Sequence, residues 1–399
     1  MSATTTVIGD RRRQAYERAA ARRHHPARRA KRQAAFGPPP AAFYWIAGVV
    51  FALVMIGLVM VLSASSITSF HVGASPWRFF TKQLCWAGLG LVALGVAFRT
   101  PIHWWRHLAT PLLVASLGLM ALPFLPGVGV EVNSTKAWVA FGPVGFQPSE
   151  VLKLSLLLWC ADRLVRRSTQ LEDLRAAYWP CTWVLVLGAG MAALQGDLGS
   201  AVVIAAIVIT VMFIGGVPLA PLAFGSAGLA TAALGFIVSS PRRLSRWTAF
   251  MDLEGTRDYE GYQVYQAIVS IANGGPTGVG VGAGTGKWGY VPLAHSDFIF
   301  AIIAEELGMV GVVAVLGGFA LLTFYGVQVA LAAKDQFGTL LAGGIVAWLF
   351  VQTVINVGGV TGSLPVTGLT LPFISFGGTS LLVSMAAAGL LLNVARYQR

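Results

Sequence analysis

The chain has 399 residues, of which 56% are hydrophobic and 11% charged, and its formal net charge is +12. Soluble globular proteins carry about 25% charged residues, so this composition excludes an ordinary soluble domain and indicates a polytopic membrane protein. The three cysteines, Cys85, Cys160 and Cys181, have no paired spacing. This argues against a disulfide framework or a cysteine-based metal site.

Residues 1–40 are strongly basic: ten lysines and arginines oppose Asp10 and Glu17, which gives +8 of the total +12. A basic block before a first membrane helix predicts a cytoplasmic N-terminus. Nucleic-acid-binding tails have a similar composition. However, anionic lipids of the adjacent leaflet are a sufficient partner, and we expect no nucleic-acid ligand. The predicted domains are a disordered cytoplasmic tail over 1–40 and a membrane domain over 41–397.

The first apolar run, 41–66, is long enough to cross a hydrocarbon core of about 30 Å as one helix. It follows a polar tail, so we expect an uncleaved anchor rather than a signal peptide. Apolar runs between charge clusters predict an all-α fold with about ten transmembrane helices and both termini cytoplasmic, because most other basic residues then face inward. The expected helices cover 42–67, 79–98, 106–125, 150–166, 178–194, 198–214, 217–239, 298–328, 337–358 and 373–395.

Two polar segments, 126–149 and 240–297, are predicted to be extracytoplasmic loops. Long loops in compact proteins are usually functional or disordered. The second contains "NGGPTGVGVGAGTGKW", which satisfies a loose dinucleotide fingerprint but lacks the strand and helix context. Trp288 also follows Lys287 where a P-loop requires Ser or Thr. We therefore expect a tight glycine-rich turn rather than a nucleotide site.

Three motifs place polar groups at membrane depth. In "QPSEVLK", Glu150 and Lys153 share one face of a helix, either as a structural ion pair or as the lining of a polar cavity. In "QGDLGS", Asp197 fits a helix cap as well as a substrate contact. The stretch 363–380, "SLPVTGLTLPFISFGGTS", combines prolines and glycines that a membrane tolerates only beside protein or a cavity. It predicts a re-entrant element beside a pocket.

The stretch "VPLAHSDFIFAIIAEELG" places His295, Ser296 and Asp297 against the start of an apolar run. Asp297 is either a helix cap or a general base. Partial burial would raise the pKa of such a base, and a nearby cation such as Lys287 or Lys153 would hold it ionised.

Two further carboxylates, Glu305 and Glu306, lie two to three turns deeper in the same run. At that depth one side chain can face a cavity while the other faces a neighbouring helix. We expect Glu306 to be structural or cavity-lining, and neither glutamate to be catalytic.

These motifs, together with "NSTKAWVAFGPVGFQPSEVLKL" and "GYQVYQAIVSIANGG", occur in the order seen in the SEDS family (shape, elongation, division and sporulation). The chain resembles that family over about 42–397, and most of all its cell-division branch. The resemblance implies a peptidoglycan glycosyltransferase that polymerises lipid II on the outer face of the cytoplasmic membrane, at the division septum. It also implies a partner, a class B penicillin-binding protein that acts as septal transpeptidase, and other divisome membrane proteins.

The resemblance also implies roles for particular residues. Asp297 is expected to deprotonate the 4-hydroxyl of the acceptor sugar, with Glu150 and Lys153 beside it. The other substrate-binding or supporting candidates are His295, Ser296, Lys287, Glu306, Asp197, Lys136 and Arg243. The chain departs from the family pattern at 133–138, 195–197 and 292–295, which affects the substrate contacts of those loops.

The leaving undecaprenyl pyrophosphate needs cationic stabilisation. The candidates are Lys153, the basic residues Arg242, Arg243 and Arg246, and a divalent cation, Mg²⁺ or Mn²⁺. No organic cofactor is expected. Three alternatives stay open: a lipid II flippase, an elongation-type polymerase, and a scaffold that recruits the transpeptidase. The long basic tail favours the division branch.

Overall fold

The computed structural model describes residues 40–71, 73, 75–132, 135–142 and 144–396. The basic tail expected over 1–40 lies outside these residues, apart from residue 40. The helices are α3 Ala41–His71, α4 Arg78–Arg99, α5 Ile102–Ala121, α6 Pro148–Arg166, α7 Tyr178–Leu194, α8 Leu198–Gly215, α9 Leu219–Val238, α10 Pro241–Met251, α11 Tyr262–Gly274, α12 Ile299–Ala332, α13 Gln336–Val360 and α14 Gly378–Arg396. Two short 3-10 helices are η1 Leu122–Phe124 and η2 Gly286–Trp288.

Helices occupy each of the ten ranges expected to cross the membrane. Within the described residues, eight helices are long and apolar enough to span it. Helix α7 has only 17 residues, and α6 carries several charged side chains. The chain is therefore the mostly helical, polytopic membrane protein that its composition predicts. The count of ten crossings and the cytoplasmic side of the bundle stay predictions.

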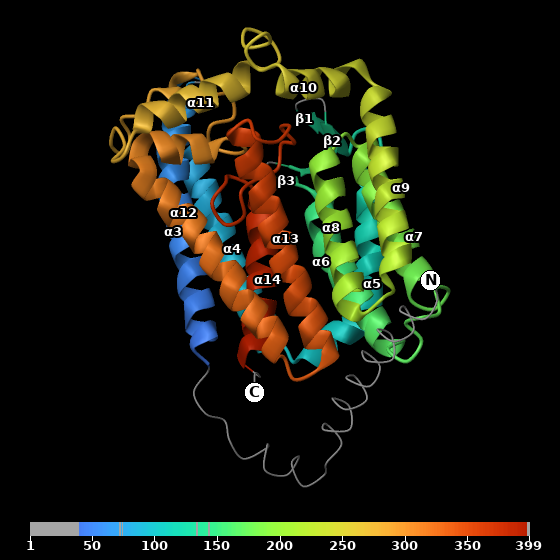
Figure 1. The fold of residues 1–399 in the computed structure, drawn as a ribbon. Coiled ribbons are helices and arrows are strands. Elements are labelled where there is room, and N and C mark those ends of the chain that lie inside the picture. The colour runs from blue at the N-terminus through green and yellow to red at the C-terminus, as the bar shows by residue number, and fades with distance from the viewer. Residues whose placement is uncertain (1–39, 72, 74, 133–134, 143, 397–399) are drawn as a thin grey trace. The chain divides into compact units, whose positions relative to one another are not determined.

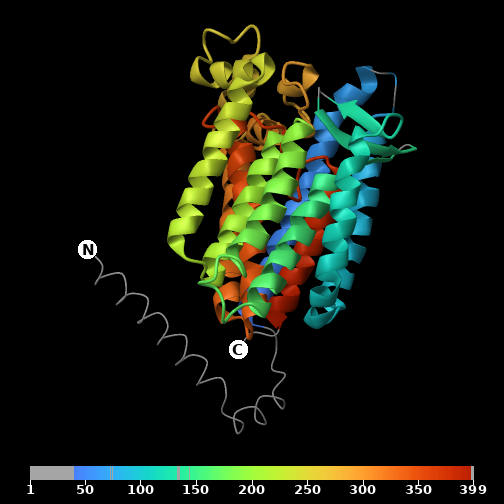
Figure 2. The same ribbon diagram turned by 90° about the vertical axis from the view of Figure 1, so that its right-hand side faces the viewer.

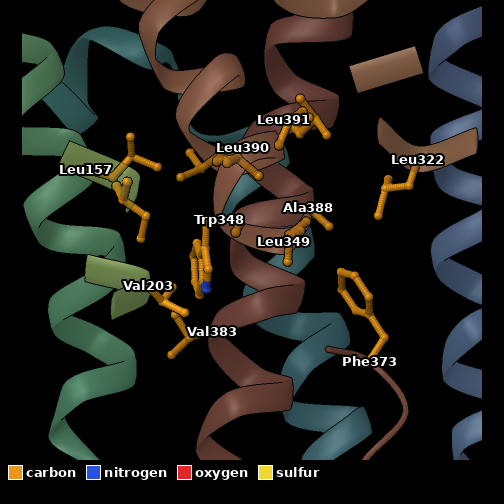
Figure 3. Packing of buried hydrophobic residues seen from close by; sticks show 14 of the residues in the cluster. Leu157, Val203, Leu322, Trp348, Leu349, Phe373, Val383, Ala388, Leu390 and Leu391 are labelled. Atoms are coloured by element: carbon orange, nitrogen blue, oxygen red, sulfur yellow. The ribbon is translucent and has the colours of Figure 1, made fainter. Parts of the chain in front are cut away.

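Helix α14 lies at the centre of the bundle, with most of its residues buried, and packs chiefly on α4. Figure 3 shows Leu390 and Leu391 of α14 in the core with Trp348 of α13 and Leu157 of α6. Helix α9 differs, because very little of it is buried. It lies at the edge of the bundle in Figure 2.

Local sequence signals explain where two helices of the site begin. Helix α6 starts at Pro148, whose fixed φ suits the first helical position, and Glu150 follows in the first turn, where the helix dipole favours a carboxylate. Helix α8 starts after Asp197, whose side chain accepts a hydrogen bond from the Ser200 amide at 2.9 Å. It ends at Gly216, which has the left-handed φ of 90° that closes many helices.

One end of the bundle, called here the sheet end, carries a small β-sheet, α10 and α11 (Figure 1). The sheet is antiparallel in the order β1-β2-β3, with β1 Gly129–Val132, β2 Thr135–Phe141 and β3 Val144–Phe146. It is an addition to the all-α fold expected from the sequence. The backbone amide of Lys136 donates to the Gln195 carbonyl at 2.9 Å, which attaches β2 to the turn between α7 and α8.

The segment between α13 and α14 is non-helical, as the prolines and glycines of 363–380 predict. Helix α14 begins at Gly378 rather than at 373, because Phe373 has a left-handed φ of 65°. The Ser375 hydroxyl accepts from the Leu371 amide at 2.8 Å, which closes the turn before the helix. A side chain at Gly378 would collide with the indole of Trp86 on α4, so glycine permits that close packing.

The glycine-rich loop, residues 278–289, is attached to α12 by two buried carboxylates. Glu305 accepts from the Thr285 amide at 2.8 Å and the Gly286 amide at 3.1 Å. Glu306 accepts from the Gly282 amide at 3.0 Å and from Lys287 Nζ at 2.6 Å. The loop is thereby fixed next to the segment that leads to Asp297.

Candidate active site

A cavity of about 1120 Å³ is lined by residues of α4, the β-sheet, α6, α10, α11, the turn before α8, the segment before α12 and the segment between α13 and α14. Its volume exceeds the usual range of about 300–1,000 Å³ for small-molecule sites. It therefore suits a ligand larger than most small molecules. Among the lining residues are Lys82, Trp138, Gln147, Glu150, Asp197, Arg246, Gln263, His295, Ser296, Asp297, Gly368 and Thr370.

Asp297 lies in the wall of this cavity, immediately before α12. It does not cap that helix: Phe298 is the N-cap residue, and no side chain there makes a capping bond. The Asp297 carbonyl instead accepts from Asn356 Nδ2 on α13 at 2.8 Å. Gly368 lies so close that a side-chain carbon there would be 3.5 Å from Asp297 Oδ2. The geometry thus favours the second of the two predicted roles, a carboxylate presented to a ligand.

The non-helical segment 363–377 holds the backbone around Asp297. The Phe376 amide donates to the His295 carbonyl at 3.0 Å, and the Ser375 hydroxyl donates to the Ser296 carbonyl at 2.7 Å. Asn356 Nδ2 also donates to the Leu369 carbonyl at 2.7 Å. The predicted re-entrant element therefore holds the backbone carbonyls of His295 and Ser296, and Asn356 of α13 holds the carbonyl of Asp297.

Removal from bulk water raises the pKa of Asp297 to about 7. The negative charge of Asp197 contributes in the same direction, whereas the Ser296 side chain and the Arg246 charge lower the pKa. A carboxylate with a pKa near the working pH is well matched to accept a proton in catalysis.

His295 is a neutral neighbour of Asp297. Its ring packs against Phe79 and Phe376, with ring centroids 4.6 Å and 5.7 Å away. Burial lowers the pKa of His295 to about 4, so the imidazole carries no charge near pH 7. Its Nδ1 is buried and has no hydrogen-bond partner in the described residues, although the residue lines the cavity.

Glu150 and Lys153 form a buried ion pair one turn apart on α6. Lys153 Nζ lies 2.8 Å from Glu150 Oε1 and 3.1 Å from Gln352 Oε1. Trp348 also donates to Gln352, at 2.8 Å. Only Glu150 lines the cavity, and its Oε2 is buried without a partner in the described residues. The pair is thus both structural and cavity-lining, with one carboxylate oxygen left for a ligand.

Asp197 is the helix cap that the sequence allowed, and its contact with a substrate stays a prediction. Its Oδ1 caps α8, while its Oδ2 accepts from Gln147 Nε2 at 2.9 Å and lies 3.4 Å from the Ser149 hydroxyl. It also lines the cavity. Its carboxylate therefore orients α6 and α8 around the site.

Five predicted site residues lie apart from the cavity lining: Lys153 and Glu306, which are held in buried ion pairs, and Lys287, Lys136 and Arg243. Lys287 Nζ contacts the Glu306 carboxylate and the Ser63 hydroxyl. It is therefore paired with Glu306 rather than with Asp297, and it does not line the cavity. Lys136 is exposed and lies 3.8 Å from Glu131. Arg243 turns back to the end of α9, where its guanidinium lies 3.6 Å above the Phe236 ring.

Several cavity or positioning residues were not found from the sequence. Asn356 and Gln352 are buried amides in the apolar helix α13, and polar groups at membrane depth are a recognised signal of function. Arg246 was considered only as one of three similar arginines. Lys82 stands alone near the start of α4, where nothing in the sequence distinguishes it from an interfacial lysine.

No three His, Cys, Asp or Glu side chains gather as a metal site within the described residues. The cavity carboxylates Glu150, Asp197, Glu260 and Asp297 do not form such a group. The expected Mg²⁺ or Mn²⁺ therefore has no protein cage here and would depend on diphosphate oxygens of the substrate for most of its ligands.

Comparison with known proteins gives consistent matches along the membrane domain. A family model described as "Cell cycle protein", which covers FtsW, RodA and SpoVE, matches residues 44–399. Stage V sporulation protein E of Bacillus subtilis is 35% identical over 348 residues, which cover 87% of this chain and 95% of that protein. The probable peptidoglycan glycosyltransferase FtsW of Legionella pneumophila is 34% identical and covers 89% of this chain and 91% of that protein.

Two solved structures have the same fold. A chain from a peptidoglycan synthase complex that coordinates polymerization and crosslinking superposes with a TM-score of 0.73 and 32% identity, covering 89% of this chain and 98% of that chain. The rod shape determining protein RodA of Thermus thermophilus superposes with a TM-score of 0.64 and 31% identity, covering 89% and 97%.

Proposed function

Because the chain belongs to the FtsW, RodA and SpoVE family of cell cycle proteins, the SEDS family, we propose that it is a peptidoglycan glycosyltransferase that polymerises lipid II. The observation that carries the proposal is the Asp297 carboxylate in the wall of a cavity of about 1120 Å³. A protein of the same fold is part of a peptidoglycan synthase complex, and a relative is named as a probable peptidoglycan glycosyltransferase.

Asp297 acts as the general base. It takes the proton of the acceptor sugar's 4-hydroxyl, and the oxygen forms a bond to the anomeric carbon of the donor. The bond between that carbon and the diphosphate breaks, and undecaprenyl pyrophosphate leaves with the electron pair. The pKa of Asp297, about 7, allows it to be ionised before the reaction and to hold the proton after it.

The residues around Asp297 act by position. Asn356, Ser375 and Phe376 hold the backbone of 295–297, which keeps the carboxylate at one place in the cavity wall. Such positioning matters because a displacement of about 1 Å at a reacting group can cost about 100-fold in rate. Glu150 Oε2 has no partner in the described residues and is assigned to a sugar hydroxyl, while Lys153 Nζ contacts Oε1 of the same carboxylate.

The expected partner is a class B penicillin-binding protein, which cross-links the new glycan. The proposal is supported by the similarity to a chain of a synthase complex that combines polymerization and crosslinking. We also propose that the protein works at the division septum with other divisome membrane proteins. Depletion distinguishes the two branches: filamentous cells indicate septal synthesis, and rounded cells indicate elongation.

Labelled lipid II and the purified full chain with its partner test the proposal. We expect glycan strands from the unaltered protein and none from Asp297→Asn. A flippase would instead move lipid II across proteoliposomes without the partner and without Asp297. A scaffold would support growth with Asp297→Ala.

A further inference from the structure

Two cations of the cavity are not used by the chemistry described above. Lys82 on α4 and Arg246 on α10 both line the cavity, and both residues are exposed. Neither makes a hydrogen bond or an ion pair within the described residues. The neighbouring cations differ: Lys153 and Lys287 are paired with glutamates, and Arg243 is held at the end of α9.

The two cations enter the cavity from separate elements. Helix α4 packs on α14 and α3, whereas α10 packs on α9. In Figure 1, α10 crosses the sheet end at the upper right, and α4 lies toward the other side of α14. The wall that carries Asp297 belongs to the same cavity. The site therefore has an acidic centre and one unpaired cation from each of two sides.

A glycosyl transfer between two lipid-linked sugars brings two diphosphates into one cavity. Each diphosphate carries negative charge and would lie near Asp297, Asp197 and Glu150, which are acidic. Cations stabilise such groups through charge-assisted hydrogen bonds, and a cation beside the leaving group is most effective as its charge develops. One cation for each diphosphate meets this requirement.

The face of α4 below Lys82 fits a lipid-linked ligand. Cys85, Trp86 and Leu89 follow Lys82 at intervals of three, four and seven residues, so they share its face, and all line the cavity. Leu89 is 54% exposed although it lines the cavity, so the cavity is open at this apolar side chain. A hydrocarbon chain attached to a diphosphate at Lys82 therefore has an apolar path out of the cavity.

We infer that Lys82 and Arg246 are the two diphosphate-binding residues, with Arg246 at the leaving diphosphate of the donor and Lys82 at the diphosphate of the acceptor. The assignment rests on the proposed function. The leaving diphosphate is attached to the carbon that the acceptor oxygen attacks, so it lies close to the base. The acceptor's own diphosphate lies at the far end of its disaccharide. Arg246 and Asp297 line the same cavity, and the Arg246 charge lowers the pKa of that carboxyl, which supports placing Arg246 on the donor side.

The first experiment is steady-state polymerisation with labelled lipid II by the full chain and its partner. Arg246→Met is expected to lower kcat about 100-fold, as loss of a transition-state donor does. Lys82→Met is expected to raise KM about tenfold with a smaller change in kcat, as loss of a charged hydrogen bond does. The variants Arg246→Lys and Lys82→Arg should recover part of each loss.

Matched controls separate these effects from a general change in charge. Arg78→Met removes an exposed cation from the same helix as Lys82, one turn earlier and outside the cavity lining. Arg257→Met removes an exposed cation that is paired with Glu254, between α10 and α11. Both controls should keep kcat and KM. The inference is overturned if the cavity variants behave like the controls, or if Arg246→Met changes KM alone.

The second experiment measures binding of undecaprenyl diphosphate to the Asp297→Asn protein in detergent, with undecaprenyl monophosphate for comparison. Two diphosphates per chain are expected, and one after either Lys82→Met or Arg246→Met, with unchanged unfolding temperatures. One diphosphate per chain from the start, or two that survive both substitutions, would refute the inference. This readout needs no turnover, so it separates a failed assignment of the two cations from a failed assignment of polymerase activity.

Discussion

The buried pair of Lys287 and Glu306 offers a direct test of what fixes the glycine-rich loop 278–289. Lys287 Nζ lies 2.6 Å from Glu306 Oε1, and the two side chains are 2% and 0% exposed. The Ser63 hydroxyl on α3 lies 3.0 Å from the same Nζ. Loss of one partner of a buried pair leaves the other charge uncompensated, which costs about 3–5 kcal/mol. Lys287→Met should therefore lower the free energy of unfolding by that amount.

A double substitution separates the charge from the packing. Glu306→Gln in the Lys287→Met background removes the uncompensated carboxylate but keeps an acceptor for the Gly282 amide. Replacing both charges of a buried pair is often close to neutral, so the double variant should recover most of the loss. Arg257→Met is the control, since its exposed pair with Glu254 is worth about 0–1 kcal/mol.

The assay is thermal and denaturant unfolding of the detergent-solubilised chain, followed by tryptophan fluorescence. Two results would refute this prediction. One is a loss of unfolding free energy for Lys287→Met as small as that for Arg257→Met. The other is a loss for the double variant equal to the sum of the losses for Lys287→Met and Glu306→Gln. Because the loop leads through η2 to Asp297, polymerisation by Lys287→Met should fall further than unfolding alone explains at temperatures where the chain stays folded.

Three further outcomes follow from the site. Since the base must be ionised, kcat should rise with pH through about 7, where Asp297 titrates. Because the pKa of this carboxyl is raised from 3.8 in the folded state, its ionisation destabilises the folded protein as the pH rises above 3.8. Asp297→Asn should therefore unfold at a higher temperature than the unaltered protein at pH 8. Asn356→Leu removes the donors to the Asp297 and Leu369 carbonyls, and single-turnover rates should drop about 10- to 100-fold with lipid II still bound. Gly368→Ala places a side chain at a left-handed φ of 74° beside the Asp297 carboxylate. We expect this variant to have a lower kcat and a lower unfolding temperature. Unchanged values of both would contradict the geometry.

The apolar runs of the sequence predicted the membrane helices because hydrocarbon leaves few alternatives to a continuous helix. The same signal fails outside the hydrocarbon. Helix α10 is short and amphipathic, and it lay hidden in a segment predicted as a loop. The strands β1 and β3 have four and three residues, which is too short for a pattern to stand out. The predicted start of α14 was wrong because the apolar side chain of Phe373 fits a membrane helix, whereas its backbone φ is left-handed.

The site was predictable where chemistry is concentrated in one motif. Asp297, Glu150 and Lys153 stand out as charged groups beside apolar runs, and the structure places Asp297 and Glu150 in one cavity. The sequence does not show which charged side chains pair with partners from other parts of the chain. Nothing local shows that Lys287 is bound to Glu306 while Arg246 is left without an ion pair in the described residues.

The central claim is that Asp297 transfers the proton in glycan polymerisation, and its most direct test is Asp297→Asn. The substituted side chain keeps the size of the carboxylate and cannot accept the proton. With labelled lipid II and the partner transpeptidase, we expect Asp297→Asn to be a folded protein that binds substrate and makes no polymer. Glycan strands made by Asp297→Asn at the rate of the unaltered protein would contradict it.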